Sequence, residues 1–160
     1  MAGVGVRSRL ARLGDRMFDR LRHPAAFSVS DDGAVDGDFD SLRGRPYALL
    51  VTFRRDGTPV PSPVWFALDS DGRAYVKTVT HAGKSKRVRN NGSALLAPST
   101  MRGKPVGPAV RGTARLLAAA EWGRAEEALA SAYGMDRRIF ERLLGEPDED
   151  VAYLEVTPRG

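Results

Sequence analysis

The chain has 160 residues, enough for one domain with a single core. Its 25 Lys and Arg residues outnumber its 20 Asp and Glu residues and give a net charge of +5, which favours an anionic ligand or partner. The absence of cysteine excludes disulfides, thiolate nucleophiles and Cys-based metal sites. The two histidines, His23 and His81, lie far apart, so we expect no metal site. No apolar run is long enough to cross a membrane and no secretion signal is visible, so we expect a cytoplasmic location.

The first 40 residues differ in composition from the rest of the chain. Apolar residues at positions 6, 10, 13, 17 and 21 share one helical face, with arginines around them, and Pro24 ends the predicted helix. Residues 28–40 are rich in Ser, Asp and Gly, which predicts a linker. We therefore divide the chain into a basic helix with its linker (1–40) and a second domain (41–160). The helix packs on its own domain or a sister subunit, or it lies on an anionic membrane surface.

From residue 45 onward the pattern changes to short strands and turns. The predicted strands cover residues 47–53, 58–68, 73–80, 94–98, 109–117 and 151–157. The predicted helices cover residues 84–90, 119–132 and 136–144. Hairpin turns ending in Gly57 and Gly72 force antiparallel pairing between the first three strands. Because such a sheet must curl to hide its edges, we expect a small barrel with helices packed outside.

Three prolines recur with period two in the second predicted strand, at Pro59, Pro61 and Pro63. They remove three N–H donors from one edge of that strand and leave its carbonyl groups as acceptors. A flat heterocycle with ring N–H groups, such as a flavin or deazaflavin, could bind to those carbonyls, beside the aromatic ring of Trp65. The alternative is that the prolines only protect an edge strand from aggregation.

A basic turn follows the third predicted strand. Thr78 stands near the end of the strand, and Gly83, Lys84 and Arg87 lie at the start of the short helix. A hydroxyl, a glycine turn and two cations three residues apart at a helix start form a cradle for phosphate or carboxylate. The alternative is a solvated basic turn. The GxxxxGK[ST] and GxGxxG phosphate motifs are absent.

Residues 47–117 resemble the flavin/deazaflavin oxidoreductases that share the pyridoxamine-phosphate-oxidase-like split barrel. The closest likeness is to the actinobacterial branch described as dependent on coenzyme F420. The resemblance is carried by LVTFRRDGTPVPSPVWFALD (50–69), KTVTHAGKSKRVRNN (77–91) and LLAPSTMRGKPVGPAVRGTARLL (95–117). It implies a mainly β fold, a six-stranded antiparallel split β-barrel with flanking helices, that forms a homodimer with a cofactor groove between the subunits.

The resemblance also assigns residues to the cofactor. The tricyclic ring would be lined by Ser62, Pro63, Val64 and Trp65, and the phosphate would be held by Thr78, Lys84 and Arg87. The implied activity is hydride transfer between the C5 atom of F420 and a small organic substrate that the sequence does not identify. A redox cofactor carries the difficult chemistry itself, which explains why no nucleophile, triad or carboxylate pair is visible.

Several alternatives remain open at this point. The protein could use FMN on the same fold as an oxidase or reductase, or it could bind F420 without turnover. The proton could come from solvent or from a hydroxyl such as Tyr47 or Ser62. We expect no nucleic-acid partner, because the strands lack the exposed aromatic ladder that single-strand binding uses.

Overall fold

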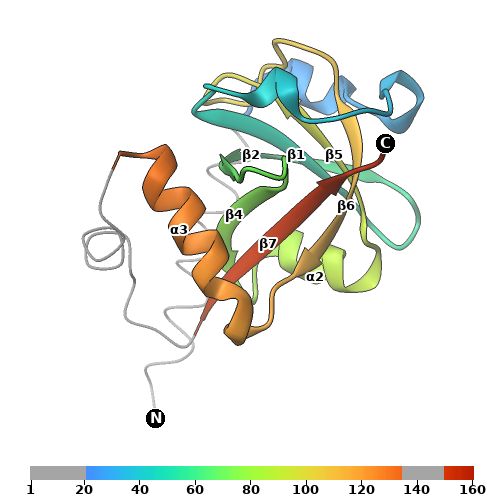
Figure 1. Cartoon of the computed structure of the whole chain (residues 1–160). Coiled ribbons are helices and arrows are strands. Elements are labelled where there is room, and N and C mark those ends of the chain that lie inside the picture. The colour runs from blue at the N-terminus through green and yellow to red at the C-terminus, as the bar shows by residue number, and fades with distance from the viewer. Residues whose placement is uncertain (1–20, 135–149) are drawn as a thin grey trace.

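One curled antiparallel sheet forms the body of the protein (Figure 1). The computed structural model describes residues 21–134 and 150–160. The strands are β1 (Tyr47–Phe53), β2 (Pro59–Trp65), β3 (Ala67–Leu68), β4 (Ala74–Val79), β5 (Ser93–Pro98), β6 (Val110–Leu116) and β7 (Val151–Pro158). They lie in the order β2-β1-β5-β6-β7-β4-β3, and each neighbouring pair is antiparallel. The predicted class, a mainly β antiparallel split barrel with flanking helices, is confirmed.

The sheet has seven strands rather than the expected six, because the stretch predicted as one strand at 58–68 is broken at Phe66. On one side of the break β2 pairs with β1, and on the other side β3 pairs with β4. The same stretch of chain therefore contributes to both margins of the sheet. Prolines in β2 leave few donors for a ladder with β4, so the barrel stays split between these two strands.

Short helices flank the sheet. They are η1 (Pro24–Ser28), η2 (Asp31–Gly33), η3 (Asp40–Leu42), α2 (Gly83–Asn90), η4 (Ala119–Glu121) and α3 (Trp122–Ala132). Figure 1 shows α3 beside β4 and β7. Ala125 and Leu129 of this helix share a buried cluster with Tyr75 and Tyr153. The predicted helices at the N-terminus and at 136–144 lie outside the described residues. Among the helices that are described, none is long and apolar enough to cross a membrane.

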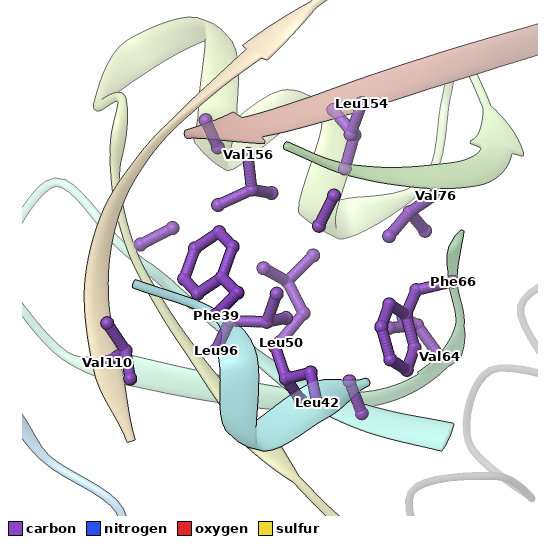
Figure 2. Packing of buried hydrophobic residues seen from close by; sticks show 14 of the residues in the cluster. Phe39, Leu42, Leu50, Val64, Phe66, Val76, Leu96, Val110, Leu154 and Val156 are labelled. Atoms are coloured by element: carbon purple, nitrogen blue, oxygen red, sulfur yellow. The ribbon is translucent and has the colours of Figure 1, made fainter. Parts of the chain in front are cut away.

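The main core fills the inside of the curled sheet. Figure 2 shows Phe39 and Leu42 reaching into it from the η3 segment, opposite side chains such as Leu50, Val76 and Leu154 from the strands. Phe39 and Leu42 are almost fully buried. Burying each large apolar side chain contributes about 1.5–3 kcal/mol, so the η3 segment is part of the domain's stability.

The linker predicted at residues 28–40 packs on the sheet instead. Ala34 is buried on the outer face, and Val35 forms a bridge with Val110. The Arg111 guanidinium also binds the Asp31 carboxylate at 3.0 Å. The composition predicted a linker because it does not reveal contacts with distant residues. Asp31 pairs with Arg111, 80 residues further along the chain, and the small side chain of Ala34 lets the segment lie against the sheet. We call residues 21–38 the strap; the division of the chain at residue 40 stays a prediction.

Candidate functional site

A pocket of about 300 Å³ lies at the split of the barrel, between β2, β4, α2 and α3. We call it the groove. It is lined by Pro63, Val64, Trp65, Lys77, Lys84, Leu129 and Tyr133. Its volume falls at the lower end of the roughly 300–1,000 Å³ that small-molecule sites occupy. Four segments that are distant in sequence supply its walls.

The proline-rich strand gives the groove its donor-poor edge. β2 is the last strand on its side of the sheet, and the register places Pro59, Pro61 and Pro63 opposite Phe53, Val51 and Leu49. Proline has no N–H, so the ladder bonds to β1 fall to the residues between the prolines. The proline carbonyl groups therefore face the margin that no described strand covers. This edge is the acceptor-rich border that the proline spacing predicts.

An aromatic pair forms one wall. Trp65 is 54% exposed, and its ring centroid lies 5.9 Å from that of Tyr133 with a 54° angle between the planes. Burial, followed by the nearby Tyr47, raises the pKa of Tyr133 to about 12. The Tyr133 hydroxyl is therefore protonated across the neutral range. A large exposed indole beside a second ring offers a surface on which a flat ligand can stack.

Two lysines give the groove its positive charge. Lys77 lies on β4, and Lys84 lies in the first turn of α2. The helix starts at Gly83, so its first backbone N–H groups and the positive end of its dipole lie at the same place. An anionic group bound here would gain from both the lysines and the helix start.

Arg87 lies deeper, folded back onto the sheet. Its Nε donates to the fully buried Thr52 hydroxyl at 2.7 Å, and its Nη1 lies 2.8 Å from the position of a Cβ atom built on Gly83. Burial lowers the pKa of Arg87, and the positive charges of Arg54 and Arg22 lower it further. No acidic side chain in residues 21–134 or 150–160 forms an ion pair with it. A half-buried cation with a neutral partner is stabilised when an anion binds beside it.

The structure brings together a part of the predicted set. Pro63, Val64, Trp65 and Lys84 line the groove. Ser62 and Thr78 are half-buried on β2 and β4, outside the groove lining, and Arg87 lies beside Gly83.

Three lining residues were not predicted: Lys77, Leu129 and Tyr133. Lys77 and Thr78 are neighbours on β4, and successive side chains of a strand point to opposite faces. Of the two, Lys77 faces the groove, so strand alternation was the signal that could have led from Thr78 to Lys77. No sequence signal indicated Leu129 or Tyr133, because they reach the groove only once α3 has packed against the sheet.

The chain also lacks a metal centre in the part of the structure that is described. No group of three or more His, Cys, Asp or Glu side chains in residues 21–134 and 150–160 is arranged to hold a metal ion. The chemistry that the groove itself offers is acceptor carbonyls, aromatic faces and cations.

The curled antiparallel sheet with two flanking helices defines a class of split β-barrels. The family model described as Pyridoxamine 5'-phosphate oxidase matches residues 39–160, so the chain belongs to the pyridoxamine 5'-phosphate oxidase family. The match starts at residue 39, which leaves the strap outside it. No curated protein matches the chain.

Solved structures share the fold at low sequence identity. A conserved hypothetical protein from Mycobacterium tuberculosis is 14% identical, with a TM-score of 0.60 over 82% of this chain and 86% of that one. A protein described as F420 reductase is 25% identical, with a TM-score of 0.51 over 79% of this chain and 97% of that one. The heme storage protein HutZ from Vibrio cholerae is 14% identical, with a TM-score of 0.56 over 74% of this chain and 84% of that one. Proteins described with different ligands share this fold, so the fold alone does not identify a ligand.

Proposed function

We propose that the protein is a cytoplasmic oxidoreductase of the F420-dependent branch, which transfers a hydride between the C5 atom of the deazaflavin and a small organic substrate. One observation carries this proposal: the groove combines a donor-poor strand edge, an exposed aromatic ring and a cationic helix start in one place. A flat ring system with a phosphate group needs these three features. The likeness to the structure described as F420 reductase supports the same choice.

The ring would lie along the β2 margin. Ring N–H groups of a deazaflavin can donate to the free carbonyl groups of the prolines, while Trp65 and Tyr133 offer flat apolar surfaces. Residues 62–65 would then border the ring, as the resemblance implies. When bound, the deazaflavin supplies hydride chemistry at C5, and the protein's task is to bind it, expose one face and orient the substrate.

The phosphate would lie at the start of α2. Lys84 reaches the groove from the first turn, Arg87 holds a half-buried positive charge, and Thr78 lies on the neighbouring strand. Each charge-assisted hydrogen bond to such a group is worth about 1.5–3 kcal/mol. The cost of burying Arg87 against other arginines is offset once the anion is present.

The proton-transfer step would use solvent or a hydroxyl such as Tyr47 or Ser62. Tyr133 lines the groove, but its hydroxyl oxygen is buried and burial raises its pKa to about 12, so we give Tyr133 a wall role and no proton-transfer role.

The proposal includes a homodimer. Trp65 is more than half exposed at the edge of the groove, and a second subunit laid over the split barrel would enclose a ring bound there. Enclosure excludes water from the reacting face, which favours hydride transfer over side reactions.

The test is a titration of the purified full chain with oxidised F420 and with FMN, followed by the fluorescence of each cofactor. We expect F420 to bind more tightly than FMN. Lys84→Ala should weaken F420 binding about tenfold, because one charge-assisted contact is lost. Lys86→Ala is the matched control, since Lys86 is exposed on the same helix and outside the groove.

Each other outcome has a definite meaning. FMN binding without F420 binding would identify a flavoprotein of the same fold. Tight F420 binding with no reduction of any substrate offered would identify a carrier of the cofactor. Equal affinities of the wild type, Lys84→Ala and Arg87→Ala would remove the phosphate cradle from the proposal.

A further inference from the structure

A second pocket, of about 240 Å³, lies on the outer face of the sheet, where the strap meets the ends of several strands. We call it the outer pocket. It shares no lining residue with the groove, so it is a separate place on the molecule. One of its walls is Asp31 of the strap. The outer pocket is therefore formed in part by a segment that the family match does not include.

Two arginines line the outer pocket, and the first of them, Arg111 on β6, is occupied by the strap. Its Nε donates to the Asp31 carboxylate at 3.0 Å, and its Nη1 donates to the Asp36 carboxylate at 3.4 Å. Its Nη2 donates to the Asp31 carbonyl at 2.7 Å. Two carboxylates thus neutralise the charge of Arg111, whose part in the pocket is to fix the strap as a wall.

The second arginine, Arg159, follows the end of β7 and has only neutral partners. Its Nε donates to the Thr113 hydroxyl at 3.4 Å and its Nη2 to the Ser93 hydroxyl at 3.2 Å, at or beyond the long end of the usual range of about 2.7–3.2 Å. Within residues 21–134 and 150–160, no Asp or Glu forms an ion pair with Arg159. Its backbone is fixed, because its N–H donates to the Arg111 carbonyl at 2.9 Å and its carbonyl accepts from the Gly37 N–H at 2.8 Å. A charged acceptor in the pocket would therefore replace long, neutral contacts of a well-placed cation with stronger ones.

The remaining walls combine polar groups with an apolar floor. The Ser93 hydroxyl accepts from Arg159 and so keeps its own hydrogen for another acceptor. The Asn91 Oδ1 accepts from the Ser93 N–H at 2.9 Å, which leaves the amide hydrogens of Asn91 as donors. The floor includes Phe53 at the end of β1 and the buried Leu95 of β5, which belong to the outer apolar cluster. Donors on one side and apolar carbon on the other suit a ligand with an anionic end and an apolar body.

We propose that the outer pocket binds a small monocarboxylate with a flat apolar body, of the kind that benzoate represents. The fork of the Arg159 guanidinium matches the two oxygens of a carboxylate, and one cation that the described chain leaves without an acidic partner suits a monoanion. The apolar body lies against Phe53 and Leu95. The volume is below the roughly 300–1,000 Å³ of typical small-molecule sites, which favours a ligand smaller than a nucleotide. The site is independent of the proposed function, because it uses none of the groove's lining residues.

A nuclear magnetic resonance titration of the full chain with sodium benzoate tests the site. We expect saturable shifts of the backbone amide signals of Ser93 and Leu95. Arg159→Gln should weaken benzoate binding about fivefold, the loss expected for one partly exposed charge pair, and Arg159→Lys, which keeps the charge without the fork, about twofold. Arg43→Gln is the matched control and should keep the wild-type affinity, because Arg43 is exposed, pairs with Asp40 and lies outside the pocket.

Two further probes separate the charge of the ligand from its ring. Benzamide has the ring without the charge and should show no saturable binding, and acetate has the charge without the ring and should bind more weakly than benzoate. Equal benzoate affinities of the wild type and Arg159→Gln would overturn the site, and equal affinities for benzoate and benzamide would overturn the carboxylate assignment. Shifts confined to groove residues such as Trp65 and Lys84 would also overturn the proposal.

Discussion

Gly103 is the residue at which the strap, the 99–108 loop and β2 meet. Its φ is +85°, in the region that favours glycine. A Cβ atom here would lie 2.9 Å from the Pro63 Cγ, 3.1 Å from the Leu49 Cδ1 and 3.5 Å from the Ala26 Cβ. The loop can approach the proline strand this closely only because the side chain is missing. The position of the donor-poor edge and that of the strap thus depend on the same glycine.

Replacing Gly103 tests this dependence. Gly103→Ala adds a strained φ and a contact with packed side chains, so we expect it to lower the free energy of unfolding by about 1–3 kcal/mol. Urea denaturation followed by circular dichroism measures the change. Gly33→Ala is the matched control, because a Cβ there meets nothing within 4 Å and should change stability by less than about 0.5 kcal/mol. Equal effects at the two positions would contradict the close packing of the loop.

At the scale of elements, a polar network attaches the α3 side of the molecule to the sheet. Arg115 on β6 donates to Glu121 at the end of η4 and to Glu155 on β7, both at 2.9 Å. Glu155 is only 5% exposed, and the Tyr75 hydroxyl lies 3.2 Å from it and 3.0 Å from Asp69. Burial and these carboxylates raise the pKa of Tyr75 to about 12. The network links three neighbouring strands to the helix that carries Tyr133.

The pH dependence of stability tests the network. Hydrogen bonds from Arg115 and from the Ala118 N–H lower the pKa of Glu121 to about 2, below its value in the unfolded chain. The stabilisation from Glu121 is therefore present above about pH 5 and is lost as the pH falls through about 2. We expect Glu121→Gln to have a lower unfolding midpoint in urea than the wild type at pH 7, with a difference that shrinks toward pH 2. Glu127→Gln, an exposed change on α3, should follow the wild type at every pH.

Elements governed by local sequence were predictable. Gly57 and Gly72 have φ values of +86° and +79° at the two hairpin turns, as the turn sequences predict. The break at Phe66 was not predictable, because it arises from pairing with two different partners, β1 and β4. The packing of the strap on the sheet was not predicted either, because it depends on contacts such as that between Asp31 and Arg111, which are distant in sequence. Local chemistry likewise pointed to Lys84, which lines the groove, whereas the position of Tyr133 depends on how α3 packs.

At the scale of the whole molecule, the split in the barrel has a chemical cause. A strand with prolines at alternate positions cannot complete a ladder on its second edge, so the sheet ends there. The groove forms between the two margins that fail to pair, and α2 and α3 supply its cationic and aromatic walls. The feature that prevents closure of the barrel is therefore the feature that creates the groove.

The exposed apolar surface predicts how copies of this chain associate. Large apolar side chains of the strap and the 99–108 loop remain exposed, among them Phe27 at 57% and Met101 at 65%. Because hydrogen bonds through Arg102 join these two segments, the side chains belong to one region of the surface, and such regions mark interaction sites. We expect sedimentation velocity to show a dimer, and Met101→Glu to shift it toward the monomer. Ser70→Glu adds the same charge at an exposed turn and should leave the dimer intact; a wild-type monomer at every concentration would contradict the prediction.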